Sequence, residues 1–459
     1  MSREIRFNAF MVGRPVHQSP GLWRHPRDRS TSYKTLNYWV DTAKLLERGK
    51  FDAIFLADGI GPKEVYGGNL DAALRHGTMI PTNDPWTLIP AMAYATEHLG
   101  FAVTGNLSFE PPYLFTRRLT TLDQLTNGRI GWNIVTGTSN AGARGMGRSG
   151  VAEHDTRYDI ADDFMEAAYK LWEGSWADDA VQWDRESGVF ADPSKVRAVH
   201  HDGPYFKVDA VHLSEPSPQR TPVLFQAGSS DRGRQFAADH AECVFLSGPS
   251  KKVIARVVSD TRRRAAEGGR DPSRLLFFPM MTIIVDATEQ AAQEKLADYK
   301  RYISYEAAVV LFSGFTGIDY SQHDPDAPIV YEKRENGVLS AIESFTLADP
   351  DKVWTLREVA NHVAIGGRGP LLVGSPSQVA DELQAWMEET DIDGFNLAYA
   401  VAPETYEDIV RLLVPELQRR GVYKTAYAPG TFREKLFGAG QARLSSEHRA
   451  AAARFVAPS

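Results

Sequence analysis

Five stretches of this sequence place polar or glycine residues at or near the end of a compact apolar run. Carboxylate, amide and hydroxyl groups there can hydrogen-bond a polar ligand, and glycine lets backbone amides approach it closely. The carboxyl ends of parallel strands lie at one face of a barrel or sheet, so such residues would converge. The alternative is that they cap the helices that follow. The residues are Asp58, Thr104, Asn106, Gly137, Thr138, Gly228, Ser229, Ser230 and Asn396.

The stretch 226–234 has the composition of an anion-binding loop. It follows an apolar run and opens a helical segment, so its glycine and serine amides would lie at the positive end of a helix dipole, which suits a phosphate. Arg232 and Arg234 add positive charge. The stretch contains neither a Walker A motif nor a GxGxxG motif. A serine-capped helix without a ligand is the alternative interpretation.

The longest candidate for a ligand loop lies within residues 128–158. Its apolar part, 130–135, is β-branched and aromatic and too short for a typical helix, which predicts a buried strand. A segment rich in Gly, Ser, Asn and Arg follows. It ends in a polar run with His154 and Tyr158, just before a helix expected at 160–172. Loops after buried strands carry the site in many α/β enzymes, although the composition also suits a surface connection.

The bulk composition excludes several classes of protein. The 459-residue chain is 43% hydrophobic and 24% charged, as globular proteins are, and its net charge of −8 argues against a nucleic-acid surface. Its one cysteine, Cys243, lies in an apolar run and predicts a buried structural thiol. The histidines lack metal-binding spacing and there is no GxSxG motif, so we expect neither a metal site nor a serine hydrolase. No apolar leader or membrane-spanning run is present, which predicts a cytoplasmic protein.

Eight short apolar runs alternate with segments of helical periodicity. Near-continuous apolar runs are typical of parallel strands that are covered on both faces. Their number favours an α/β fold of the (β/α)8 TIM-barrel type over an open doubly wound sheet, which would show similar strands. The expected strands are residues 5–10, 51–58, 99–106, 130–137, 222–228, 241–248, 275–285 and 393–400.

Two long irregular segments interrupt this alternation, after the fourth and the seventh expected strand. The first spans residues 173–221, and the second follows the helical segment 288–305 and ends at Gly369. Connections that follow barrel strands lie on the C-terminal face, so we expect both insertions over the active site, where they could act as lids. We interpret residues 1–438 as one barrel domain with insertions, and residues 439–459 as a tail that is either an arm to a neighbouring subunit or disordered.

Several blocks of the sequence together resemble one enzyme family. They include GLWRHP (21–26), LLERGKFDAIFLAD (45–58), TLDQLTNGRIGWNIVTG (121–137), EHDTRYDIADDFMEAAYKLWEGSW (153–176), DGFNLAYAVAPETYEDIVRLLVPELQRRG (393–421) and REKLFG (433–438). Through them the chain resembles the flavin-dependent monooxygenases of the bacterial-luciferase superfamily, in the group of nitrilotriacetate, dibenzothiophene-sulfone, long-chain-alkane and dimethyl-sulfide monooxygenases. The blocks span nearly the whole chain, and the resemblance implies a (β/α)8 barrel with insertions.

The resemblance also implies a cofactor and a partner. The cosubstrates would be reduced FMN (FMNH2) and O2, a separate NAD(P)H:flavin reductase would supply the FMNH2, and the enzyme would be a homodimer or homotetramer. Tyr158, Ser229 and Ser230 would hold the flavin phosphate, in agreement with the anion-binding composition of the serine loop. Asp58 and Thr104 would flank the isoalloxazine ring.

Four further residues complete the implied site. Gly137 and His154 are the other flavin-binding positions. His17 and Asn106 are the catalytic candidates, His17 as a proton donor or a hydrogen-bond partner of the substrate and Asn106 as a hydrogen-bond partner of a flavin oxygen. A structural role is the alternative for His17.

The expected substrate pocket departs from the alkane type. This chain has Arg14, Lys63, Met79 and Thr138 where that type has cysteine, tyrosine, glutamine and histidine, whereas His17 matches. Two cations in a pocket would suit a polar or anionic substrate, because a buried charge needs a partner. We therefore expect a small substrate that is organosulfur, heteroatom-containing or carboxylated. If both cations point to solvent, this argument is lost.

Three alternatives remain open at the level of sequence. A long-chain alkane could be the substrate after all. A deazaflavin-dependent oxidoreductase on the same barrel would act without O2, and a non-enzymatic flavin-binding protein would bind FMN without oxygen chemistry. One barrel hosts many chemistries, so the fold does not separate them. O2 consumption with FMNH2 would separate a monooxygenase from the deazaflavin enzyme, and oxygen chemistry beyond that of free flavin would separate it from a flavin-binding protein.

Overall fold

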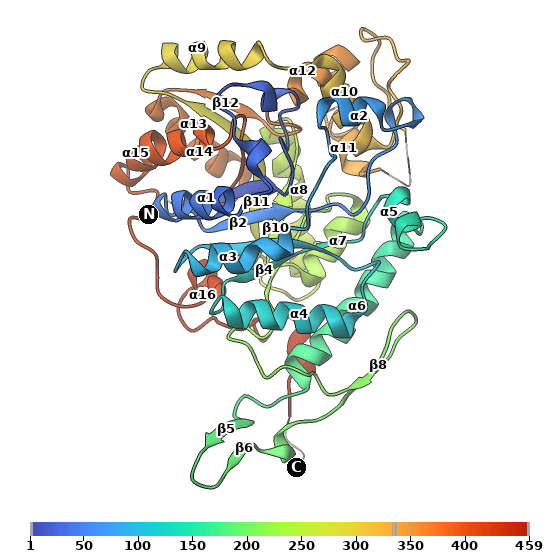
Figure 1. Ribbon diagram of the computed structural model, residues 1–459, viewed down its shortest axis with the longest axis vertical. Helices are drawn as coiled ribbons and strands as arrows, with labels where there is room; N and C mark the ends of the chain where they lie inside the picture. The colour runs from blue at the N-terminus through green and yellow to red at the C-terminus, as the bar shows by residue number, and fades with distance from the viewer. Residues whose placement is uncertain (1–2, 333, 335–336, 350, 457–459) are drawn as a thin grey trace.

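Eight parallel strands close into a barrel, as the sequence predicts (Figure 1). The computed structural model describes residues 3–332, 334, 337–349 and 351–456. Pairing of β10 with β11 closes the ring. A further strand, β12 (Leu371–Gly374), pairs with the last residues of β11, beyond those that pair with β10. The barrel strands are β1 (Arg6–Val12), β2 (Ala53–Ala57), β3 (Gly100–Asn106), β4 (Ile130–Val135), β9 (Val223–Gln226), β10 (Cys243–Leu246), β11 (Leu276–Val285) and β13 (Gly394–Ala398).

Helices cover the outer face of the barrel, and the one after β4 begins earlier than predicted. Helix α6 starts at His154 and not at Ile160, because no glycine or proline interrupts its first turns and the Arg157 amide already donates to the Glu153 carbonyl. His154 and Tyr158 therefore lie on a helix. The covering helices are α1 (Leu36–Arg48), α3 (Ile89–Tyr94), α4 (Pro112–Leu125), α6 (His154–Gly174), α7 (Asp231–His240), α8 (Lys251–Glu267), α13 (Pro376–Thr390), α14 (Glu404–Asp408) and α15 (Val414–Arg419).

Two layers of apolar side chains hold the barrel together. Phe55, Phe225, Phe245 and Phe278 come from four strands and belong to one cluster, in which the rings of Phe55 and Phe245 stack with centroids 4.1 Å apart. Side chains of strands that are not neighbours meet only inside the barrel, so this cluster fills its interior. A larger cluster joins the strands to the covering helices. Cys243 is buried in the interior cluster, which confirms the predicted structural thiol.

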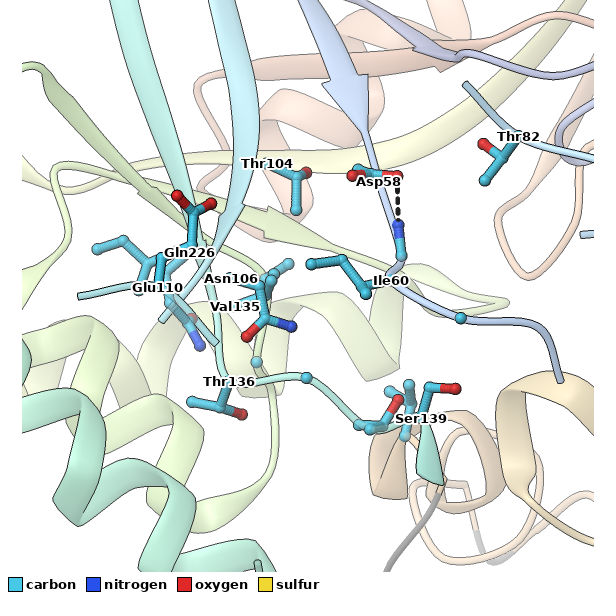
Figure 2. A pocket seen from close by; sticks show the side chains of 18 of the residues that line it. Asp58, Ile60, Thr82, Thr104, Asn106, Glu110, Val135, Thr136, Ser139 and Gln226 are labelled. Carbon is cyan, nitrogen blue, oxygen red and sulfur yellow. Dashed lines mark hydrogen bonds between the residues drawn. The ribbon is translucent and has the colours of Figure 1, made fainter. Parts of the chain in front are cut away.

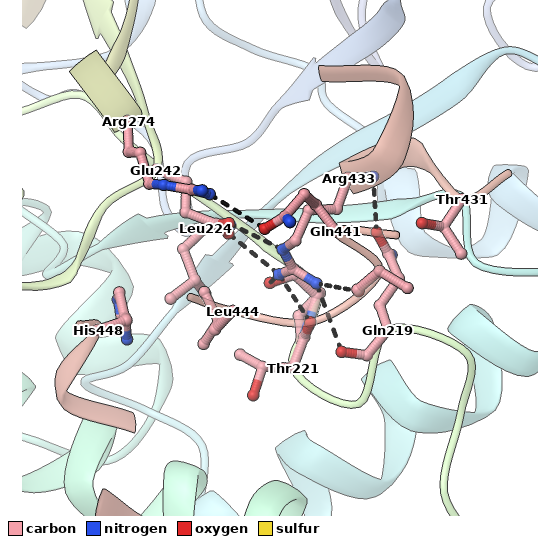
Figure 3. A network of polar contacts seen from close by, with 12 residues as sticks. Gln219, Thr221, Leu224, Glu242, Arg274, Thr431, Arg433, Gln441, Leu444 and His448 are labelled. Atoms are coloured by element: carbon pink, nitrogen blue, oxygen red, sulfur yellow. Dashed lines mark hydrogen bonds and ion pairs between the residues drawn. The ribbon is translucent and has the colours of Figure 1, made fainter. Parts of the chain in front are cut away.

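A short helix near the C-terminus closes the end of the barrel where the strands begin. Phe432 of α16 (Phe432–Phe437) packs into the interior cluster, and its amide donates to the Gly128 carbonyl just before β4. The buried guanidinium of Arg433 binds the Glu242 carboxylate (Nε–Oε1 2.8 Å) and the carbonyl oxygens of residues 221 and 222 (Figure 3). Burial of this positive charge is tolerated because carboxylate and carbonyl oxygens accept hydrogen bonds from the guanidinium N–H groups.

The first insertion lies away from the mouth of the barrel, so its predicted position over the active site is wrong. It contains two antiparallel hairpins, β5 (Val181–Asp184) with β6 (Val189–Ala191) and β7 (Val199–Asp202) with β8 (Lys207–Ala210). These follow the C-terminal end of α6, and Val199 and Val208 pack against Ala167 and Leu171 of that helix. A helix that follows a barrel strand runs back toward the opposite face, which carries the hairpins away from α2, α10 and α11 (Figure 1).

The second insertion lies at the mouth, as predicted. It follows α9 (Glu289–Lys300), and its helices are α10 (Tyr305–Thr316), α11 (Leu339–Glu343) and α12 (Leu356–Val363). The last three surround a small apolar core of their own, which includes Phe312, Phe345 and Val359. Helix α10 also packs against α2 (Asp71–His76), which belongs to the long connection after β2.

The described part of the C-terminal tail packs against its own chain. The short helix η8 (Arg449–Ala453) contacts α6, and His448 Nε2 lies 2.9 Å from the His240 carbonyl oxygen. Arg443 forms ion pairs with Glu173 and Asp178. Within the described residues, none of the helices has the length and apolar character that a membrane span requires.

Candidate active site

A cavity of about 550 Å³ opens at the carboxyl ends of β2, β3, β4 and β9 (Figure 2). Its wall combines apolar side chains such as Ile60, Trp86 and Phe236 with convergent polar groups, as cofactor sites do. Most of the predicted site residues that end strands meet here. The predicted residues in the wall are Asp58, Lys63, Thr104, Asn106, Gly137, Thr138, Tyr158 and Gly228.

Asp58 follows the last residue of β2 and carries the most strongly perturbed carboxylate of the cavity. Its Oδ1 accepts a hydrogen bond from the Gly59 amide (2.8 Å). Burial, followed by the nearby negative charge of Asp84, raises the pKa of Asp58 to about 6, and Arg14 opposes the shift. The carboxylate therefore changes charge close to neutral pH, which is a property of functional sites more often than of structural ones.

The polar residues of β3 are held in one orientation by their neighbours. The hydroxyl of Thr104 accepts from Asn133 Nδ2 (3.0 Å), and Asn106 Oδ1 accepts from the Ser108 amide (2.8 Å). Gly137 has φ +71°, and a Cβ there would lie 2.5 Å from Asn106 Nδ2. The oxygen of Asn106 is thus engaged in a turn, and the group left to bind a ligand is its NH2 donor.

Tyr158 forms a tight cradle with the loop after β9. A Cβ at Gly228 would lie 2.4 Å from the Tyr158 hydroxyl oxygen, and one at Gly233 would lie 2.8 Å from it. Ser230 caps α7: its Oγ accepts from the Gly233 amide and lies 3.2 Å from His154 Nε2. Glycine is therefore required where the loop approaches the hydroxyl, and backbone amides, a phenol and a helix N-terminus face one small volume. That donor set suits a phosphate.

The serines of this loop lie behind the cavity wall and do not form it. Ser229 faces a second cavity of about 570 Å³ on the other side of the loop, between α7, α8 and α11. The wall of the main cavity at this point is Tyr158, Ala227 and Gly228, together with Gln226, whose Oε1 is buried without a hydrogen-bond partner among the described residues. An unsatisfied buried acceptor next to the cradle fits a ligand that supplies hydrogen-bond donors, as a flavin does.

Lys63 reaches the cavity because two glycine contacts fix its loop. A Cβ at Gly142 on α5 (Asn140–Gly145) would lie 2.1 Å from the Ile60 carbonyl oxygen, so α5 packs directly on the backbone that precedes Lys63. On the other side, a Cβ at Gly314 of α10 would lie 3.4 Å from Lys63 Cβ. The ammonium group donates to Thr138 Oγ1 (2.8 Å), and burial, then Arg157, lowers its pKa to about 8.

Three predicted residues lie close to the cavity without lining it. Arg14 is 9% exposed, its pKa is lowered to about 10 by burial, and its charge acts on Asp58. Met79 packs against Gly314, where an added Cβ would lie 2.6 Å from Met79 Sδ and 3.4 Å from Lys63 Cβ. His17 is buried against Phe10, and burial together with Arg14 holds its pKa well below the ordinary value, so it is neutral at neutral pH.

Several residues of the cavity wall were not predicted. Asp84 caps a helical turn by accepting from the Trp86 amide (2.9 Å), and the Asp-Pro pair in IPTNDP (80–85) was the signal for it. Arg118 pairs with Glu110 (2.8 Å). Gln226, which opens the predicted anion-binding stretch 226–234, lines the cavity as well, and so do the unpredicted residues Phe236, Val338 and Arg368. The last two belong to the second insertion, where no local pattern marked them.

The fold and the site define a TIM barrel with a cofactor-sized cavity at its C-terminal mouth, where one part of the wall has a donor set that suits an anion. The chain belongs to the luciferase-like monooxygenase family, whose model matches residues 21–394. This confirms the family that the sequence blocks resemble.

Two relatives and one solved structure match nearly the whole chain. A dimethyl-sulfide monooxygenase of Hyphomicrobium sulfonivorans is 46% identical over 98% of this chain and 94% of its own length. A long-chain alkane monooxygenase of Geobacillus thermodenitrificans is 45% identical over 99% of both chains. The crystal structure of a riboflavin lyase with modified FMN and riboflavin superposes with a TM-score of 0.93 at 36% identity, covering 99% of this chain and 100% of the other. The chain is accordingly an oxidoreductase of the monooxygenase class.

Proposed function

We propose that this chain is the oxygenase of a two-component system, which takes FMNH2 from a separate NAD(P)H:flavin reductase and uses O2 to oxygenate a small organic substrate. The observation that carries the proposal is the cradle of Tyr158 and Gly228, which opens into a cavity large enough for a flavin. The riboflavin lyase structure with modified FMN supports a flavin in this kind of barrel. Bound reduced flavin supplies the electrons that activate O2 for transfer of one oxygen atom.

The residues of this chain would bind and orient the flavin. Tyr158, the backbone of the Ser229–Ser230 loop and the N-terminus of α7 would hold the phosphate, and His154 would orient Ser230 through their 3.2 Å contact. Asp58, Thr104 and Gly137 would border the ring system. Asn106 would donate its NH2 group to a flavin oxygen, since its own oxygen is already bonded.

His17 would act by hydrogen bonding and not as a positively charged acid. Its pKa lies well below the ordinary range, because the ring is buried and the Arg14 guanidinium is close. A neutral ring of this kind positions a neighbour or the substrate without supplying a proton at neutral pH. The second insertion would exclude water from the cavity, which protects the reactive flavin from side reactions.

We propose a substrate that is organosulfur, heteroatom-containing or carboxylated. The relative from Hyphomicrobium carries the name of an organosulfur substrate, and Lys63 with Thr138 gives this chain a polar wall. Arg14 and Met79 would shape the pocket from behind. Turnover of a neutral long-chain alkane that is unchanged in the Arg14→Ala variant would contradict this assignment and favour an alkane monooxygenase.

The deciding experiment is an anaerobic titration with FMNH2, followed by mixing with O2 while the flavin spectrum is recorded. We expect tight binding of FMNH2 and an oxygenated-flavin spectrum that lasts longer than it does in free solution. Substrates can then be screened by the rate at which they return the spectrum to oxidised FMN. Oxidation as fast as that of free flavin would refute the proposal, and binding of a reduced deazaflavin instead would establish the alternative oxidoreductase.

A further inference from the structure

Two cations of the cavity wall lack a carboxylate partner. Among the described residues, neither Lys63 nor Arg368 has a carboxylate oxygen within ion-pair distance, and Arg368 Nη1 is buried without a hydrogen-bond partner. The guanidinium lies over the ring of Phe315, with its carbon 4.9 Å from the ring centroid. Stacking on an aromatic face leaves the planar edge of the guanidinium free to bind an anion in two-point fashion.

Consecutive residues of α10 hold these two cations. Gly314 packs against the side chain of Lys63, and the ring of Phe315 contacts the guanidinium of Arg368. Both cations line the same cavity, although they lie in connections far apart in the sequence. Contacts with α10 therefore help to set both positively charged side chains in the wall of one cavity, Lys63 from the connection after β2 and Arg368 from the second insertion.

The other charged groups of the wall are already engaged. The third cation, Arg118, pairs with Glu110 at 2.8 Å. The Asp84 carboxylate accepts a hydrogen bond from the Trp86 amide. The Asp58 carboxylate accepts one from the Gly59 amide and interacts electrostatically with Arg14. Because a desolvated cation without a counter-ion is unfavourable, the charges of Lys63 and Arg368 are best explained by an anion that enters with the ligand.

We propose that Lys63 and Arg368 form a subsite for a carboxylate or sulfonate group of the substrate. The inference rests on the proposed function and deepens it, since it selects the anionic members of the proposed substrate class. The flavin phosphate is a second possible source of such an anion, but its cradle is built from Tyr158 and the loop after β9. The substrate would thus be anchored by the connection after β2 and by the second insertion, and the flavin by α6 and the loop after β9.

The test uses the full chain loaded with oxidised FMN and compares two matched probes. The probes are (methylthio)acetate and its uncharged analogue 2-(methylthio)acetamide, with methanesulfonate as a second anion, and binding is measured by isothermal titration calorimetry. We expect the acid to bind about tenfold more tightly than the amide. Arg368→Met and Lys63→Met should each abolish this preference, whereas Arg368→Lys, which keeps the charge, should retain part of it.

Control measurements separate the subsite from a structural role. Arg118→Met removes a wall cation that already has a partner, so the preference for the acid should persist. The affinity for FMN should be unchanged in Arg368→Met, and the thermal midpoint of each variant shows that it is folded.

Three outcomes would overturn the inference. Equal binding of acid and amide by the unmodified protein would show that no anion subsite exists. Loss of FMN affinity in Arg368→Met with an intact preference for the acid would assign Arg368 to the flavin phosphate. An unchanged preference in both Arg368→Met and Lys63→Met would leave these residues a structural role. If the unmodified protein does not bind FMN, the same titrations on the apoprotein test the subsite while the proposed function fails.

Discussion

The Tyr158 hydroxyl lies so close to Gly228 that a Cβ at residue 228 would be 2.4 Å from the hydroxyl oxygen. Tyr158 lies in the second turn of α6, the helix that precedes β9, and Gly228 lies in the loop that follows β9. The contact therefore joins α6 to the loop after the neighbouring barrel strand. Because residue 228 is glycine, the Tyr158 phenol, the backbone of the loop after β9 and the N-terminus of α7 can lie close together. We propose this relationship as the basis of the flavin binding that we assign to the chain.

The first prediction concerns this contact. Gly228→Ala should lower the affinity for FMN by about tenfold or more, because the methyl group would displace the Tyr158 hydroxyl and the Gln226 amide from the cradle. Quenching of FMN fluorescence on titration measures the effect. Gly145→Ala, at a position with no atom close to the added methyl group, is the control and should bind FMN normally. Equal affinities of the two variants would show that the cradle does not hold the flavin.

The second prediction is a pH dependence of anion binding. Burial lowers the pKa of Lys63 to about 8, so the side chain loses its charge as the pH rises through that value. A bound anion favours the charged form, and the affinity for (methylthio)acetate should therefore fall by about tenfold between about pH 7.5 and 9.5. In Lys63→Met this decrease should disappear, and calorimetric titrations across the range provide the comparison. A decrease of the same size in both proteins would assign it to another group.

The third prediction concerns stability and Asp58. Its pKa is raised to about 6 by burial and by Asp84, above the ordinary value of 3.8, so the folded state holds an extra proton between these two values. The contribution of Asp58 to the free energy of unfolding should then decrease as the pH rises from about 4 to 6, by about 3 kcal/mol in total.

Asp58→Asn isolates this contribution. The variant should be as stable as the unmodified protein near pH 4 and more stable above pH 6, because the amide carries no charge to bury. Urea unfolding at a series of pH values measures the difference, and stability curves that stay parallel over this range would contradict the raised pKa. We also expect the variant to bind flavin differently, since Asp58 lies in the cavity wall.

The fourth prediction concerns the closed end of the barrel. Arg433→Met should destabilise the protein by about 3–5 kcal/mol, because it leaves the buried Glu242 carboxylate without its partner. The double variant Arg433→Met with Glu242→Gln removes both charges and should recover part of the loss. Chemical denaturation of the three proteins gives the coupling between the residues. FMN affinity should remain unchanged, since neither residue lines the cavity, and a large loss of binding would show that the two ends of the barrel are coupled.

Much of the fold could be predicted from the sequence, because its signals are local. A strand covered on both faces must be apolar along its whole length, and that requirement marked all eight barrel strands, from β1 to β13. The polar residues at strand ends also proved informative, since a parallel barrel brings every carboxyl end to one face, and Asp58, Thr104 and Gly137 meet there. The sequence blocks were sufficient to predict the family, which the match over residues 21–394 confirms.

Only the tertiary structure decided where the insertions lie and which charges face the cavity. The segment 173–221 is polar and irregular like the second insertion, but it follows the end of α6 and so lies at the opposite face. No sequence pattern around Arg368 indicates that it binds a ligand. It lines the cavity because α10 packs at the mouth and the ring of Phe315 contacts its guanidinium. Periodicity encodes which residues are buried along one element. The presence of Lys63 and Arg368 in the wall of one cavity depends instead on packing between elements that are distant in the chain.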